Sequence, residues 1–181
     1  MTLYDDAIAE LTRWAPPNPG QTALRTSYLE HLLTHPDGLS RDCHPDHVTA
    51  SLLVMSESGD RVLLNLHGRY GIWVQFGGHC EPADASLAEA ALREGAEESG
   101  ITGLALVGRG PAQLSRHEVR CGPVRPSHHL DVRYVAIAPP GAQPAVSPES
   151  LDVRWFDVGD LPADLEPEII ELVALARLLL P

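Results

Sequence analysis

The sequence predicts an α/β sandwich in which a mixed sheet lies between helices. From His47 onward, short apolar runs with the length of strands are separated by turns rich in glycine, serine and aspartate. One long helical pattern interrupts these runs at Leu87–Ser99, and another closes the chain at residues 168–180. Strands that surround one central helix favour a sandwich over a fold of regularly alternating strands and helices.

The main domain contains seven stretches that we expect to form strands, because each is short, apolar and bounded by turn residues. They are residues 47–55, 61–67, 72–78, 104–108, 112–120, 129–138 and 153–158. A loop rich in proline, glycine and serine, residues 139–150, separates the last two.

Two helical patterns precede these strands. Apolar residues recur at helical spacing over residues 3–14, and a proline-rich segment ends that pattern. A second pattern, residues 22–34, ends before Pro36. We therefore expect residues 1–40 to form a helical hairpin as an N-terminal extension, and residues 41–181 to form the functional domain.

The charge of the chain excludes several classes of function. Its net charge is −12, and all 13 basic residues are arginine. Without lysine, neither a Walker A loop nor a Schiff base can form. An acidic chain also binds a nucleic-acid backbone poorly, so we expect no nucleic-acid polymer as a partner. An anionic substrate would need a cation or clustered arginines to offset the repulsion.

Cysteine usage and the termini indicate a cytoplasmic protein. Cys43, Cys80 and Cys121 are far apart and form no CxxC pair, which is typical of reduced thiols. The N-terminus lacks the basic and apolar segments of a signal peptide. The longest apolar run is too short to span a bilayer and contains Arg177. We therefore expect no membrane contact.

The helix expected at Leu87–Ser99 has clear start and stop signals. Asp84 or Ser86 can cap its N-terminus, and Gly100 suits the left-handed conformation in which helices often end. Its apolar residues occupy one half of the circumference, the half that would face a core.

Three glutamates of this helix, Glu94, Glu97 and Glu98, fall within about 100° of one another at the edge of the apolar face. Nothing within the helix neutralises the i,i+4 pair of Glu94 and Glu98. Such carboxylates offer the oxygen ligands that Mg²⁺ or Mn²⁺ needs, although a solvated acidic face is the alternative interpretation. The preceding pair Gly77-Gly78 favours the metal site, because it lets the backbone approach a ligand closely.

The stretch from Gly78 to Ile101 resembles a Nudix box, whose pattern is G, five residues, E, seven residues, then REUxEExGU with U aliphatic. Six residues match the second half: Arg93, Glu94, Glu97, Glu98, Gly100 and Ile101. The first half departs, since Asp84 replaces the glutamate and eight residues precede Arg93. Gly95 also stands where the family prefers an aliphatic residue, and glycine inside a helix costs about 1 kcal/mol against alanine.

The resemblance implies a Nudix-type α/β/α sandwich with a mixed sheet. It also implies hydrolysis, dependent on Mg²⁺ or Mn²⁺, of a pyrophosphate bond in a nucleoside diphosphate linked to another group. An NTP, a nucleotide sugar, ADP-ribose and a dinucleotide are substrates of this kind. The resemblance does not choose among them, because residues outside the box set substrate specificity.

The resemblance also implies roles for residues of the box. The implied metal ligands are Glu94, Glu97 and Glu98, with the carbonyl of Gly77 or Gly78 nearby. One glutamate would double as general base. Arg93 completes the catalytic set, because a salt bridge to Asp84 would let it orient the glutamates.

Four residues outside the box are further candidates for substrate binding or a second metal site. His79 could contact phosphate or cap its loop. Glu149 lies in the loop where some Nudix enzymes place a further glutamate, and a solvated loop acid is the alternative. Arg69 and Arg133 are candidate phosphate contacts, although scattered surface arginine is the simpler interpretation of either one alone.

Two segments contain histidine and acidic residues in the manner of metal sites. In His128-His129-x-Asp131, strand alternation places His129 and Asp131 on one face and His128 on the other. The segment 43–47, Cys-His-Pro-Asp-His, is more simply a loop that enters a strand. We therefore expect no zinc site from either segment.

Two classes of function stay open. The leading hypothesis is a metal-dependent pyrophosphohydrolase. The alternative is a Nudix-like regulatory domain that binds a nucleotide without turnover, which would be expected to lack some of the box glutamates. The N-terminal hairpin could serve such a domain as a partner surface or a homodimer contact. An isomerase acting on an isoprenoid diphosphate fits poorly, because the box keeps the hydrolase pattern.

Overall fold

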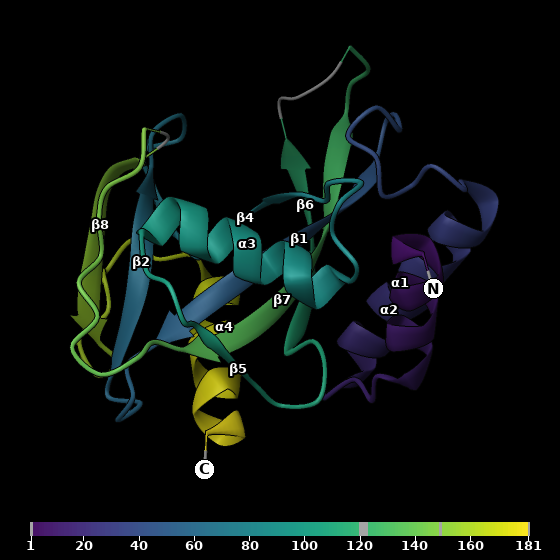
Figure 1. Ribbon diagram of the computed structural model, residues 1–181. Coiled ribbons are helices and arrows are strands. Elements are labelled where there is room, and N and C mark those ends of the chain that lie inside the picture. Colours follow the sequence, from purple (N-terminus) through teal and green to yellow (C-terminus); the bar gives the residue numbers. More distant parts are fainter. Residues whose placement is uncertain (1, 120–122, 149, 181) are drawn as a thin grey trace.

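A computed structural model describes residues 2–119, 123–148 and 150–180 (Figure 1). Its helices are α1 (Leu3–Arg13), α2 (Pro19–Thr34), α3 (Leu87–Ser99) and α4 (Pro167–Leu179). Its strands are β1 (His47–Met55), β2 (Arg61–His67), β3 (Trp73–Val74), β4 (Phe76–His79), β5 (Ala105–Val107), β6 (Gln113–Val119), β7 (Ser127–Ile137) and β8 (Ser150–Asp157). The predicted α/β sandwich with a mixed sheet is confirmed.

Strand β1 is the centre of the sheet, and all of its 9 residues are buried. β7 lies parallel to it along its whole length, from His47 opposite His129 to Met55 opposite Ile137. The other edge of β1 has two antiparallel partners, β4 beside the first half and β2 beside the end. β6 and β5 both pair with β7, and β3 and β8 pair with β2.

The single strand expected at residues 72–78 is two strands in the structure. β3 pairs with β2, where Val74 lies opposite Asn65, whereas β4 pairs with β1, where Phe76 lies opposite Leu52. The chain crosses at Gln75 from the edge of one strand to the edge of another, so one continuous register is impossible. This crossing directs the glycine pair toward the centre of the sheet.

Helices cover the two faces of the sheet. In Figure 1, α3 lies in front of the sheet and α4 behind it. Alternate residues of β1 divide between the two cores: Val48, Ala50, Leu52 and Val54 on the side of α3, and Leu53 and Met55 on the side of α4. On the α4 side, the first half of β1 instead presents His47, Thr49 and Ser51. One face of the central strand is therefore apolar at one end and polar at the other.

The N-terminal helices pack against the main domain. Ala7 and Leu11 of α1 and Tyr28 and Leu32 of α2 are fully buried in the core shared with β1 and α3. α2 begins at Pro19, three residues before the predicted start, because the Asn18 side chain accepts a hydrogen bond from the Gln21 N–H at 2.9 Å. Among the described residues, no helix combines the length and the apolar character needed to cross a membrane.

Candidate active site

Helix α3 is fixed at both ends and in the middle. The Ser86 hydroxyl accepts a hydrogen bond from the Glu89 N–H at 3.0 Å, and Gly100 is left-handed with φ 68°. At Gly95, a Cβ atom would lie 2.5 Å from Cδ2 of Leu52 on β1. The glycine that departs from the family pattern therefore lets the helix lie close to the central strand.

Arg93 connects α3 to the loop before it. Its Nε and Nη2 lie 3.0 Å from the two carboxylate oxygens of Asp84, and Nη2 also donates to the His79 carbonyl at 3.0 Å. Burial alone would raise the pKa of Asp84, but hydrogen bonds from Arg93 and the Glu81 N–H hold it below its ordinary value. Arg93 reaches Asp84 despite the extra residue between them, because the intervening loop absorbs it.

The three box glutamates are held in two ways, two of them by Arg93 and one by a backbone N–H. Glu94 lies 2.9 Å from Nη1 of Arg93, and Glu97, 62% exposed, lies 3.3 Å from the same nitrogen. Glu98 accepts a hydrogen bond from the Gly77 N–H at 3.0 Å. The carboxylates of α3 therefore lie against the backbone of β4.

Close packing requires glycine at Gly77, and the absence of a side chain at Gly78 leaves room for the Glu94 carboxylate. A Cβ on Gly78 would lie 2.7 and 2.8 Å from the carboxylate oxygens of Glu94. A Cβ on Gly77 would lie 2.7 Å from the Cα of Ser51. Carboxylate oxygens beside an open backbone fit a hard cation such as Mg²⁺ or Mn²⁺, so the donor set suits the implied metal.

A cavity of about 460 Å³ opens on the α4 side of the sheet and includes Gly77, Gly78 and His79 in its wall. Register pairing places polar side chains from several strands on this face, since directly opposed residues share a face. Those lining the cavity are Thr49, Ser51, His79, His117, His129, Asp131 and Arg133. The box glutamates are not among the residues that line the cavity, but β4 adjoins both, because Gly77 and Gly78 line the cavity and lie beside Glu98 and Glu94.

The predicted phosphate contact Arg133 is 4% exposed and pairs with buried Asp131, with Nε 2.9 Å from the carboxylate. Thr49 and Ser51 also donate to Asp131, at 3.0 and 2.7 Å. Burial alone would raise the pKa of Asp131, but the charge of Arg133 and the hydrogen bonds lower it. Arg133 lines the cavity, yet its charge is already balanced, which weakens it as a site for phosphate.

The predicted candidate Arg69 lies at the rim of the cavity and is exposed. Its guanidinium carbon is 5.7 Å from the centre of the Tyr70 ring, which also lines the cavity. This pair supplies a positive charge and an aromatic face where a ligand would enter. The predicted Glu149 lies outside the described residues.

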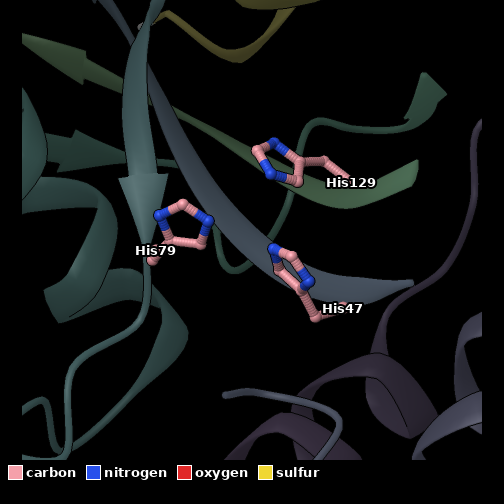
Figure 2. A group of neighbouring side chains, drawn as sticks. All are labelled: His47, His79 and His129. Carbon is pink, nitrogen blue, oxygen red and sulfur yellow. The ribbon is translucent and has the colours of Figure 1, made fainter. Parts of the chain in front are cut away.

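Three histidines from different strands meet beside the cavity (Figure 2). His47 begins β1, His79 ends β4 and His129 lies on β7 directly opposite His47. Burial lowers the pKa of His79 to about 4 and that of His129 to about 3, and it also lowers the pKa of His47. All three rings are therefore neutral at neutral pH.

The two histidine-rich segments do not act as separate clusters. His128 points away from His129 and bonds Asp46, with Nδ1 3.0 Å from the carboxylate, as strand alternation requires. The group in the structure instead contains His47 from the first segment, His129 from the second, and His79, which belongs to neither. Sequence reasoning missed this group and the Asp131 network. Alternate polar residues at 47–51 and 129–133 were the available signal.

Comparisons with known proteins identify the fold and the family. No curated protein matches the chain. A NUDIX-family hydrolase from Clostridium perfringens is 23% identical, over 75% of this chain and 98% of its own, with a TM-score of 0.62. The dihydroneopterin triphosphate pyrophosphohydrolase of E. coli is 19% identical, over 70% and 91%, with a TM-score of 0.56.

A third similar structure is the NUDIX domain of Shewanella oneidensis NrtR, complexed with ADP ribose. It is 19% identical, over 82% of this chain and 96% of its own, with a TM-score of 0.55. At these identities the likeness shows the fold alone. The family model of the NUDIX domain matches residues 45–176. With this match over most of its length, the chain belongs to the Nudix family.

Proposed function

We propose that this protein hydrolyses a pyrophosphate bond in a nucleotide derivative, with a divalent cation held by Glu94, Glu97 and Glu98. The observation that carries the proposal is the junction of α3 and β4. There Arg93, anchored on Asp84, holds Glu94 beside Gly78, while the Gly77 N–H holds Glu98. Glu94, Glu97 and Glu98 are all present, which a domain that only binds nucleotide would not require.

The bound cation, Mg²⁺ or Mn²⁺, would neutralise phosphate charge and polarise the phosphorus centre. The chain supplies the rest of the chemistry. Glu97 is the most exposed of the three glutamates, and water can reach it, so we assign it the role of accepting a proton from the attacking water. Arg93 fixes the position of Glu94 and keeps the carboxylates from moving apart by mutual repulsion.

The cavity would hold the group attached to the diphosphate. Its wall combines Tyr70, Ile72 and Val74 with polar groups of the sheet, which suits a base or sugar. Arg69 at its rim would meet phosphate oxygens and offset part of the net negative charge of the protein. The cavity shares β4 with the carboxylates, so one substrate can occupy both.

A substrate panel tests the proposal. NTPs, dinucleotides, ADP-ribose, nucleotide sugars and coenzyme A would be incubated with Mg²⁺ or Mn²⁺ and the products identified. We expect hydrolysis of at least one, abolished by EDTA and reduced about 10²- to 10⁴-fold in Glu97→Gln and Glu98→Gln. Glu89→Gln, at the exposed start of the same helix, is the matched control and should keep full activity.

Two outcomes would count against hydrolysis. Full activity in both variants would remove the glutamates from the mechanism. A panel without turnover, together with tight nucleotide binding, would support the alternative of a regulatory Nudix domain. Circular dichroism on each variant would show that the fold is intact.

A further inference from the structure

The three histidines beside the cavity form a nearly equilateral group. Ring centres of His47 and His79 are 5.0 Å apart, those of His47 and His129 4.9 Å, and those of His79 and His129 5.1 Å. Each ring turns a nitrogen toward the space between them (Figure 2). One ligand nitrogen from each lies within 4.8 Å of the other two.

The environment of His47 prepares it as a ligand. The side chain is 1% exposed, and its Nδ1 lies 3.1 Å from the carbonyl oxygen of Cys43. A proton on Nδ1 satisfies that contact and leaves a lone pair on Nε2. Nε2 is buried and has no hydrogen-bond partner. Burying such an atom unpaired is costly, whereas a carbonyl behind one nitrogen and a metal before the other is the usual arrangement of a ligating histidine.

We propose that His47, His79 and His129 bind a divalent transition-metal ion, Zn²⁺ in the first instance. Imidazole nitrogen suits zinc, copper and nickel, whereas Mg²⁺ prefers oxygen, so this site differs in chemistry from the carboxylates of α3. Zinc–nitrogen bonds of about 2.0 Å at a tetrahedral angle separate ligand nitrogens by about 3.3 Å. Starting from 4.8 Å or less, each ring needs to move by about 1 Å or less toward the centre.

The cavity leaves one side of this metal open. His79 and His129 both line it, whereas His47 lies behind them. His117 packs on the ring of His129, with centres 5.6 Å apart, and lies outside the triangle. Three protein ligands with a fourth position facing a cavity is the arrangement of zinc sites that take an exogenous ligand. An anionic oxygen, such as that of a phosphate, is the ligand class this position fits.

The experiment is a Zn²⁺ titration of untagged protein by calorimetry in excess Mg²⁺, which occupies oxygen ligands. We expect one Zn²⁺ per chain. Loss of a second-sphere partner costs about 10- to 100-fold in affinity, so removing a ligand in His79→Asn or His129→Asn should cost at least about 100-fold. His128→Asn is the matched control, since it removes a histidine from the same strand but the opposite face, and its affinity should be unchanged.

Replacing the buried His47 could prevent folding. His79 is only half-buried, so the variant His79→Asn tests the site without that risk. Visible absorption of bound Co²⁺ reports the ligand set directly, because four-coordinate Co²⁺ absorbs more strongly than octahedral Co²⁺ at carboxylates. Absence of Zn²⁺ binding in excess Mg²⁺ would overturn the proposal. So would Zn²⁺ binding that is lost in Glu98→Gln and kept in both histidine variants. The readout is binding, so it stands or falls independently of hydrolysis.

Discussion

The carboxylates on α3 and the histidines on the sheet differ in how the chain assembles them. Glu94, Glu97 and Glu98 lie within five consecutive residues of one helix, where Arg93 pairs with the first two and the Gly77 N–H bonds the third. His47, His79 and His129 come from three strands, and their rings are neutral at neutral pH because burial lowers their pKa values. β4 joins the two groups, since Gly77 and Gly78 contact the glutamates and His79 completes the histidines.

The two groups therefore depend on the fold in different ways, because the glutamates are close in sequence and the histidines are not. A helix brings i, i+3 and i+4 residues together by itself, so the carboxylates need only α3 and its anchor. The histidines meet only when β1, β4 and β7 are in the correct register. Damage to the sheet should therefore disturb the histidines first, and changes at the glutamates should leave the fold intact.

The largest effect on stability is expected at the Asp131–Arg133 pair beneath the cavity. Asp131→Asn removes the nearer charge partner of a buried guanidinium and leaves only the half-exposed Glu168, 3.6 Å away, so it costs about 3–5 kcal/mol in the free energy of unfolding. Urea denaturation would measure it. Asp152→Asn is the matched control, because Asp152 pairs with Arg154 in the same Asp-x-Arg arrangement on the partly exposed strand β8. There the loss should be at most about 1 kcal/mol, and equal losses at both positions would contradict this account.

An intermediate effect is expected at the anchor of α3. Asp84→Asn removes a largely buried partner of Arg93, whose own side chain is 21% exposed, so about 1–3 kcal/mol should be lost. The pKa of Asp84 is depressed in the folded state. Its contribution to stability is therefore present above the unfolded value of 3.8 and is lost as the pH falls through the folded value.

Denaturation at several pH values would test this contribution. The wild type should lose more stability than Asp84→Asn between neutral pH and pH 3, because the variant has already lost the ionised pair. Parallel pH profiles of the two proteins would show that Asp84 does not contribute in this way.

The smallest effect on stability is expected at Glu97. Its side chain is 62% exposed, so Glu97→Gln should change the free energy of unfolding by no more than about 0.5 kcal/mol. The same variant should lose most of its hydrolytic activity if the proposed function is right. A large loss of stability would show instead that the glutamate supports the fold, and it would weaken the contrast between the two groups.

The sequence predicted the bounds of α3 and the family well, because these depend on local spacing. Ser86, Gly100 and the box residues carry their signals within one stretch of chain. The crossing at Gln75 could not be predicted, because it depends on which strand each half of 72–78 pairs with. For the same reason, the sequence pattern grouped His129 with its neighbour His128. Its actual partner His47 is 82 positions away (129 − 47) and becomes a neighbour only through the pairing of β1 with β7.

The N-terminal hairpin has a consequence for the outer edge of the sheet. Gln21 of α2 bonds both backbone groups of Leu114 on β6, donating to its carbonyl at 2.9 Å and accepting from its N–H at 2.6 Å. The side chain thus imitates an additional strand where β6 has no other neighbour than β7 among the described residues. An edge capped in this way cannot accept a strand from another molecule at that point. A chain shortened by its first two helices would expose that edge and would be more prone to aggregate.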